Sequence, residues 1–219
     1  IKWVPQDDLI NDVSKVKSPR ELDAFREAGE VSTKAMSAMM KALIAGKSEA
    51  HAAAEGARWV IRGGGIPYLI RLAHGKDREM LDFSRNNHTG FDASSPKRGD
   101  LVRGWLMGPM KHGYYLDPGR TAVCGGKPTR RQRRLIEACA GIVNGVIEAV
   151  RSGVTAHELA RVGDKLYKEA GGGKTKDQAA AQWPLYGHVN DMFFMNPMYG
   201  VKCAGPRDKL KENMVASSE

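Results

Sequence analysis

Apolar residues recur at helical spacing near the start of the chain, in two stretches separated by a glycine. The first begins at Ser18-Pro19-Arg20-Glu21, a capping box in which the serine hydroxyl and the glutamate satisfy the first amides of a helix. It predicts a long helix that ends at Gly46. The second stretch predicts a helix from about Ser48 to Ile61, because the run Gly63-Gly64-Gly65 that follows does not favour helix.

The same two signals predict a second pair of helices later in the chain. Thr129-Arg130-Arg131-Gln132 opens a third helix and Thr155-Ala156-His157-Glu158 a fourth, each with a hydroxyl at the cap and a side chain that reaches back to it. The fourth helix is expected to end near Gly171-Gly172-Gly173. The helices are therefore expected in pairs.

The segments between and after the helix pairs have a pattern typical of strands. The clearest predicted strands are Leu101 to Met107 and Tyr114 to Cys124, and shorter strand-like pieces lie at 192–195 and 199–203. Two helices, strands, two helices and strands in this order predict an α+β fold in which helices cover one face of a curved antiparallel sheet. Because the two halves share this plan, an internal pseudo-repeat is expected.

Composition and charge limit the classes of protein to which the chain belongs. Its 219 residues are 42% hydrophobic and 27% charged, and no run of about 18 apolar residues occurs, so we expect a soluble globular protein without a membrane span. Cys124, Cys139 and Cys203 are odd in number and widely spaced, which indicates a reducing compartment and hence a cytoplasmic protein. The net charge of +9 is scattered apart from the cluster at 130–134, where no aromatic residues interleave, so a nucleic-acid partner is not expected.

Four short motifs occur in an order and at separations that are fairly specific together. They are Lys17-Ser18-Pro19-Arg20-Glu21-Leu22, Gly99-Asp100 with Gly113-Tyr114-Tyr115 and Arg120-Thr121, Gly187-His188, and Leu210 to Val215 with Glu219. The chain thereby resembles the pita-bread hydrolases, the family of methionine aminopeptidases, prolidases and creatinase. The resemblance implies the pita-bread fold, a curved antiparallel sheet covered by two pairs of helices, and a homodimer. It also implies that 1–17 is a linker from a missing N-terminal domain, and that the catalytic domain, 18–219, is truncated at its C-terminal end.

The resemblance implies a metal site in which one ligand is replaced. The family fold holds two divalent metal ions on two Asp, one His and two Glu side chains. Asp117, His188 and Glu219 match three of these ligands, but Trp105 stands at the position of the first Asp, and Met195 stands where many members have a second His. An indole does not ligate a metal, so a normal two-metal site is not expected. We expect no cofactor or, as the alternative, a single divalent cation on the three matching side chains.

Creatinase is the precedent for a member without metals, and the resemblance to it gives the leading functional prediction. His88, eleven residues before Gly99, matches the proton-shuttling His of creatinase. We therefore predict a creatinase-like hydrolase of a small-molecule C–N bond, with His88 as general acid and base. The side chains of Glu219, Asp117 and His188 would position substrate or water.

Asp117 departs from the creatinase pattern, so three alternatives stay open. One is a metal-dependent Xaa-Pro aminopeptidase or prolidase relative. Another is an enzyme similar to dimethylsulfoniopropionate lyase. The last is a catalytically inactive pita-bread domain that binds a partner.

The replaced ligand also predicts the character of the pocket. Trp105, Met107, Met195 and His112 are expected to line an apolar or cation-binding pocket. Such a pocket favours a small organic cation or an aromatic compound as substrate. The other histidines that the site does not use, His51, His74 and His157, are expected on helix surfaces or in loops.

Each site candidate also has a purely structural interpretation. Trp105 can fill the core from a strand, and His188 can be a hydrogen-bonded core residue. His88 can belong to a surface loop, Asp117 can cap a turn, and Glu219 can lie in a frayed end.

Overall fold

The computed structural model describes residues 9–75, 89–172, 185–190, 198–200 and 209–218. The chain divides into two compact units. We call Ala24–Ala140 the central unit, and Ile1–Asp23 with Gly141–Glu219 the terminal unit. The described residues form helices and antiparallel strands, in agreement with the predicted α+β class.

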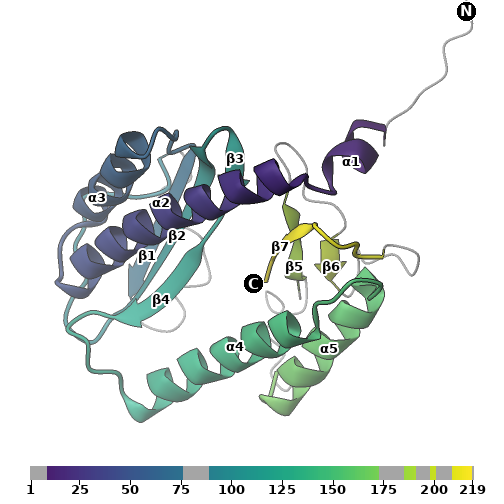
Figure 1. Cartoon of the computed structure of the whole chain (residues 1–219). Helices are drawn as coiled ribbons and strands as arrows, with labels where there is room; N and C mark the ends of the chain where they lie inside the picture. The colour runs from purple at the N-terminus through teal and green to yellow at the C-terminus, as the bar shows by residue number, and fades with distance from the viewer. Residues whose placement is uncertain (1–8, 76–88, 173–184, 191–197, 201–208, 219) are drawn as a thin grey trace, which may run out of the picture. The chain divides into compact units, whose positions relative to one another are not determined.

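The central unit is built on a four-stranded antiparallel sheet. Its strands are β1 (Leu69–Gly75), β2 (Leu101–Lys111), β3 (Tyr114–Leu116) and β4 (Gly119–Val123). β2 pairs with each of the other three strands. Figure 1 shows two helices, α2 (Pro19–Ile44) and α3 (Glu49–Arg62), beside this sheet.

The two helices cover one face of the sheet with a continuous core. Even-numbered residues of β2, such as Val102 and Leu106, are buried together with Leu72 of β1 against Met39 and Val60 of the helices. The even-numbered side chains of β2 share this face because side chains alternate along a strand. The odd-numbered residues from 103 to 111 lie on the opposite face and are only half-buried.

The chain between α3 and β1 lies against the end of β2 without room for side chains. A Cβ on Gly65 would stand 2.2 Å from the carbonyl oxygen of Met110, and one on Gly108 would stand 2.4 Å from that of Ile66. The Ile66 amide donates a hydrogen bond of 2.8 Å to the Pro109 carbonyl. The last glycine of the run that ends α3 thus also permits a backbone contact with the sheet.

The predicted helices are confirmed, with boundaries that follow their caps. The Ser18 amide is 2.8 Å from Glu21 Oε2, and the Glu21 amide is 3.3 Å from Ser18 Oγ, as a capping box requires. The same reciprocal bonds join Thr129 with Gln132 at the start of α4 (Arg130–Ala149). The helix predicted at Thr155 is α5 (Ala156–Glu169), which also has a complete capping box.

The structure differs from the strand predictions. The strand predicted from Tyr114 to Cys124 is two strands, β3 and β4, because Asp117-Pro118 interrupts it. β1 was not predicted at all. The piece at 192–195 lies outside the described residues, and the piece at 199–203 is described only in β6 (Met198–Gly200).

The terminal unit repeats the plan of helices followed by an antiparallel sheet. It contains α1 (Leu9–Ser14), the second half of α4, and α5, followed by a three-stranded sheet with the order β6-β5-β7. The central strand is β5 (Leu185–Asn190), and β7 is Val215–Ser217. Leu159 and Val189 are fully buried in the core of this unit. The shared plan agrees with the expected pseudo-repeat.

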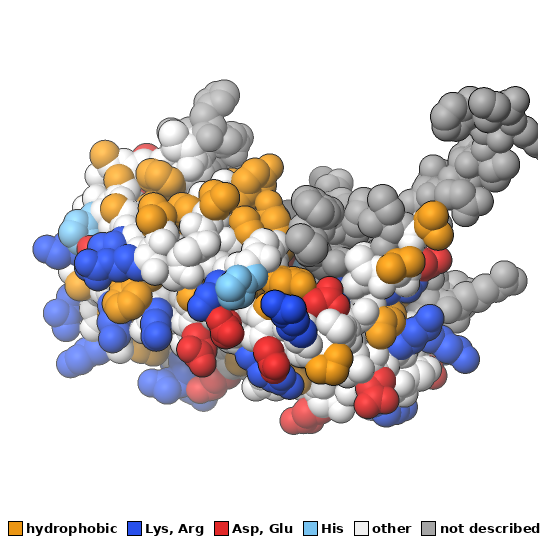
Figure 2. All heavy atoms as spheres, turned by 45° about the horizontal axis from the view of Figure 1, so that its top comes forward, with side chains coloured by type: hydrophobic (Ala, Val, Ile, Leu, Met, Phe, Trp, Pro, Cys, Tyr) orange, Lys and Arg blue, Asp and Glu red, His pale blue; other side chains and the backbone are white. Residues whose placement is uncertain are grey.

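No helix in the described ranges is long and apolar enough to cross a membrane. Figure 2 shows that hydrophobic side chains gather on one part of the central unit. Exposed large apolar residues of this unit include Ile61 at the end of α3 and Ile66 and Tyr68 in the connection after it.

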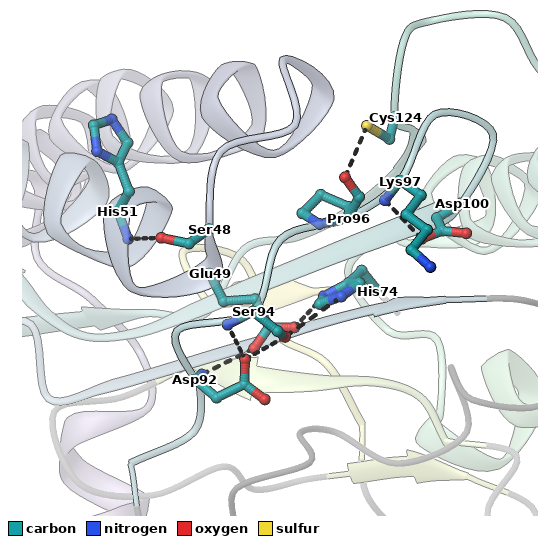
Figure 3. A network of polar contacts seen from close by, with 10 residues as sticks. All are labelled: Ser48, Glu49, His51, His74, Asp92, Ser94, Pro96, Lys97, Asp100 and Cys124. Atoms are coloured by element: carbon teal, nitrogen blue, oxygen red, sulfur yellow. Dashed lines mark hydrogen bonds and ion pairs between the residues drawn. The ribbon is translucent and has the colours of Figure 1, made fainter.

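A buried polar network ties the first turn of α3 to the loop before β2 (Figure 3). Glu49 is fully buried, and its Oε1 lies 2.6 Å from His74 Nδ1, while its Oε2 accepts from the Asp92 amide at 3.0 Å. The amides of Glu49 and Ala50 donate to the carbonyls of Ser94 and Asp92 at 3.0 and 2.8 Å. His74 is thus buried within β1, which corrects its expected place on a helix surface or in a loop.

We expect Tyr186→Phe to stabilise the protein. Tyr186 Oη is buried without a hydrogen-bond partner among the described residues, and desolvation raises the pKa of this hydroxyl to about 12. Removing an unsatisfied buried hydroxyl recovers its desolvation cost, about 1 kcal/mol. Urea denaturation measures this gain, with Tyr68→Phe at an exposed ring as the control. A loss of stability in Tyr186→Phe would show that the hydroxyl is satisfied after all.

We expect Glu49→Gln to change how stability depends on pH. Burial raises the pKa of Glu49 above its ordinary value of 4.5. Between that value and the raised pKa, the folded protein holds a proton that the unfolded chain releases, so this group lowers stability as pH rises. The variant lacks this loss. As pH rises through this range, its free energy of unfolding should therefore increase relative to that of the unchanged protein, by at most about 1.4 kcal/mol per pH unit.

Urea denaturation across a pH series measures this difference. Glu30→Gln, on an exposed position of α2, is the matched control and should leave the pH dependence unchanged. The expectation would be contradicted if the free energies of unfolding of the unchanged protein and of Glu49→Gln changed with pH in parallel.

Candidate functional site

Trp105 lies in the middle of β2 and has a fixed orientation. Its Nε1–H donates a hydrogen bond of 3.0 Å to the carbonyl oxygen of Asp117, and its ring is half-buried. Arg71 is its direct partner on β1, and the guanidinium carbon is 5.8 Å from the centroid of the indole. Both contacts hold the ring against the sheet face opposite to the helices.

Asp117 is brought beside Trp105 by the short connection between β3 and β4. Leu116 pairs with Gly108 and Gly119 pairs with Trp105, so the Asp117 backbone must pass close to the indole. A Cβ on Gly119 would be 3.6 Å from the indole Cδ1, an ordinary contact distance. The structure therefore joins two of the predicted site residues in one place.

Met107 and His112, the two other described residues expected to line the pocket, lie in different places. Met107 follows Trp105 by two residues, so it shares its face, and it pairs with Leu69. His112 lies in the β2–β3 turn with φ 53°, and its Nε2 is 3.4 Å from Glu27 Oε2. It is about 20 Å along the strand from Trp105 by strand rise. A role for His112 in substrate binding stays a prediction, and its described contact is with Glu27.

The side chains of Lys111 and His112 both contact Glu27 at that turn. Its Oε2 is 2.7 Å from Lys111 Nζ and 3.4 Å from His112 Nε2. The hydrogen bond from Lys111 is the main reason that the pKa of Glu27 is lowered. All three side chains are at least one-third exposed, so we treat the cluster as a surface contact that holds the turn.

His188 occupies the central strand of the terminal sheet. Its side chain is 1% exposed, and its Nδ1 lies 3.3 Å from the carbonyl oxygen of Val189. It pairs with Met198 on one side and Ser217 on the other.

Asp117 belongs to the central unit and His188 to the terminal unit, so their joint role stays a prediction. The other candidates, His88, Met195 and Glu219, lie outside the described residues and stay predictions too.

The described residues around Trp105 do not by themselves fit a divalent cation. Nowhere in the described part of the chain do three or more His, Cys, Asp or Glu side chains come together in a group that could hold a metal ion. Next to Trp105 on the same face are two arginines, Arg71 and Arg103.

Sequence reasoning did not place either arginine beside Trp105, although one signal was available. Arg103 precedes Trp105 by two positions in a predicted strand, so alternation alone places it on the same face. Arg71 required the pairing of β1 with β2, and β1 had not been predicted.

The Glu49–His74–Ser94 arrangement has the order of a catalytic triad but not its geometry. Ser94 Oγ is 3.5 Å from His74 Nε2, which is too long for a base that must take the hydroxyl proton. That hydroxyl donates instead to Asp92 Oδ1. We therefore treat the network as a structural clamp on the loop before β2.

A hollow of about 400 Å³ opens between α2 and β4. Its lining residues are Gly29, Ser32, Thr33, Met36, Ser37, Met40, Pro118, Arg120, Thr121 and Ala122. The lining contains no histidine and no carboxylate, so it offers no residue for general acid–base chemistry.

Comparison with known proteins identifies a family for this chain and several relatives. The chain matches metallopeptidase family M24 over residues 23–219. It is 29% identical over 174 residues to the Xaa-Pro dipeptidase of Pyrococcus furiosus, covering 76% of this chain and 46% of that protein. It is 28% identical over 174 residues to the Xaa-Pro dipeptidase of Lactobacillus delbrueckii subsp. lactis, covering 76% of this chain and 44% of that protein. The chain thus spans about half the length of the curated relatives it matches.

Solved structures agree with this relationship. The prolidase from Pyrococcus furiosus superposes with a TM-score of 0.79 at 26% identity, covering 96% of this chain and 58% of that one. The X-Pro aminopeptidase from Thermotoga maritima shares the fold, with a TM-score of 0.79 at 19% identity over 98% of this chain and 57% of that one. These matches confirm the expected pita-bread fold.

The same findings correct one expectation. We expected no cofactor, and the match to a family of metallopeptidases contradicts that. The creatinase-like interpretation gains no support, because the relatives named above are Xaa-Pro dipeptidases. With its fold and a match over nearly its whole length, the chain belongs to metallopeptidase family M24.

Proposed function

We propose that the protein is a metal-dependent hydrolase of Xaa-Pro dipeptides. The observation that carries this proposal is the family match over residues 23–219, together with curated relatives that are Xaa-Pro dipeptidases. It corresponds to the prolidase-like alternative of the sequence analysis rather than to the creatinase-like prediction. The reaction is still hydrolysis of a C–N bond, here the bond to proline nitrogen.

We propose Asp117, His188 and Glu219 as the ligands of one divalent cation. A carboxylate–imidazole–carboxylate set suits a hard or borderline divalent ion. Trp105 supplies no ligand, so the proposal is a single-metal site. When bound, such an ion polarises a carbonyl group and lowers the pKa of bound water.

Other side chains have roles that do not depend on the number of metal ions. His88 is the proposed general acid and base, because an imidazole both accepts a proton from water and returns it to the leaving nitrogen near neutral pH. Trp105 is fixed by its bond to the Asp117 carbonyl and provides a rigid wall for the substrate. Met107 extends that wall on the same face, and Met195 is proposed to line it too.

A homodimer and a cytoplasmic location remain part of the proposal. Creatine hydrolysis, elimination from a sulfonium compound and partner binding without catalysis are the rival activities. They differ in substrate and in metal requirement, so one set of assays separates them.

We expect the full chain to hydrolyse alanyl-proline only when a divalent metal is bound. Chelation should abolish turnover, and added divalent metal should restore it. Asp117→Asn and His188→Ala should each lower kcat/KM at least about 100-fold and lower the bound metal measured by elemental analysis. His157→Ala, at an exposed position of α5, is the control for His188→Ala.

Two results would contradict the proposal. One is turnover of creatine or of a sulfonium substrate in place of alanyl-proline. The other is hydrolysis of alanyl-proline that survives removal of all metal.

A further inference from the structure

We propose that the hollow between α2 and β4 binds a small organic anion with an aromatic body. The hollow lies on the face of the central sheet that the helices cover, whereas Trp105 lies on the opposite face. The inference therefore goes beyond the proposed peptidase function and does not depend on it.

The most buried part of the hollow is apolar. Met36 and Met40, one turn apart on α2, are 5% and 7% exposed and line it together with Ala122 of β4. The volume of about 400 Å³ lies within the range of small-molecule sites, which are mostly apolar with a few polar groups. Because thioether groups make favourable contacts with aromatic rings, this lining suits an aromatic body.

Arg120 brings a positive charge to the same hollow. It pairs with Gly104 of β2, and a Cβ on Gly104 would lie 3.0 Å from Met40 Sδ, so this pair faces the side of the sheet that α2 covers. Nη1 of Arg120 donates a hydrogen bond of 2.6 Å to the carbonyl oxygen of Gly119, which leaves the other N–H donors of the guanidinium for a ligand. The lining contains no carboxylate to neutralise the charge, so it favours an anion.

Ser32 adds a hydroxyl group that has no partner among the described residues. It is 5% exposed and lines the hollow, and none of the described hydrogen bonds involves its side chain. A carboxylate has two acceptor oxygens, so it can accept from a hydroxyl and from a guanidinium at once. Ser32 and Arg120 are therefore the proposed donors to the anionic group.

Gly29 keeps the hollow open on the side of α2. Glycine is unfavourable in the interior of a helix. A Cβ at Gly29 would meet no other described atom within 4 Å, so close packing in the described part of the chain does not require glycine there. Gly29 lines the hollow, and a ligand in that space accounts for the missing side chain.

The test compares 3-phenylpropanoate with its uncharged counterpart, 3-phenylpropanamide. NMR spectra of the full chain, labelled at the methionine methyl groups, report binding in the hollow because Met36 and Met40 line it. Met36→Leu and Met40→Leu assign the two signals. Both signals should shift with either ligand, and the anion should act at lower concentration than the amide.

Two variants test the charge and the space. Arg120→Gln should weaken binding of the anion about fivefold and leave binding of the amide unchanged, because the lost interaction is that of an exposed charge. Arg134→Gln, at an exposed arginine of α4, is the matched control and should change neither. Gly29→Leu should abolish binding of both ligands by filling the hollow, with a urea midpoint at least as high as that of the unchanged protein.

Three results would overturn the inference. The first is an absence of shifts at Met36 and Met40 when the anion is added. The second is an Arg120→Gln variant that weakens both ligands equally or neither. The third is undiminished binding in folded Gly29→Leu protein. Arg120 is exposed, so its substitution tests the charge even if Gly29→Leu does not fold, and none of these measurements requires hydrolysis of a dipeptide.

Discussion

The central unit depends on the pairing of one strand. β2 is the neighbour of β1, β3 and β4, so its alternation of side chains decides what lies on each face of the sheet. Its even-numbered side chains, including Val102, Leu106 and Met110, are fully buried under α2 and α3. Its odd-numbered side chains therefore make up the other face, and the candidate chemistry must be found there.

On that face, side-chain identity departs from the expected metal chemistry. The family resemblance implies a carboxylate where Trp105 stands, and Arg71 and Arg103 lie on the same face as its neighbours. The chain thus combines the fold of a metallopeptidase family with an indole at a position where the family resemblance implied a metal ligand.

Local signals predicted the helices well. Hydroxyl caps and glycine stops are read within a few residues, and the capping boxes at Ser18, Thr129 and Thr155 are all formed. Strands were harder, because their boundaries depend on partners far away in the sequence. β1 carries mixed polar and apolar residues, and its assignment follows only from its pairing with β2.

The candidate site likewise combines residues that local motifs identify with residues that depend on tertiary pairing. Trp105 and Asp117 were identified from motif positions, and the structure places them in contact. Arg71 and the buried partner of Glu49, His74, were missed because each depends on tertiary pairing. His74 is followed by a glycine, a lysine and further polar residues, a sequence typical of a loop, but it is buried in the sheet.

Gly65, in the connection before β1, and Gly108, in β2, restrict the register in which the strands can pair. The approach of Gly65 and Gly108 to opposing carbonyl groups tolerates no side chain on either residue. If the connection between α3 and β1 shifted by one position along β2, the side chain of Met107 or Pro109 would enter a gap that has room only for a hydrogen atom. Steric exclusion therefore reinforces the hydrogen-bond register, and it protects this sheet from the slipped alignments to which glycine-containing strands are otherwise prone.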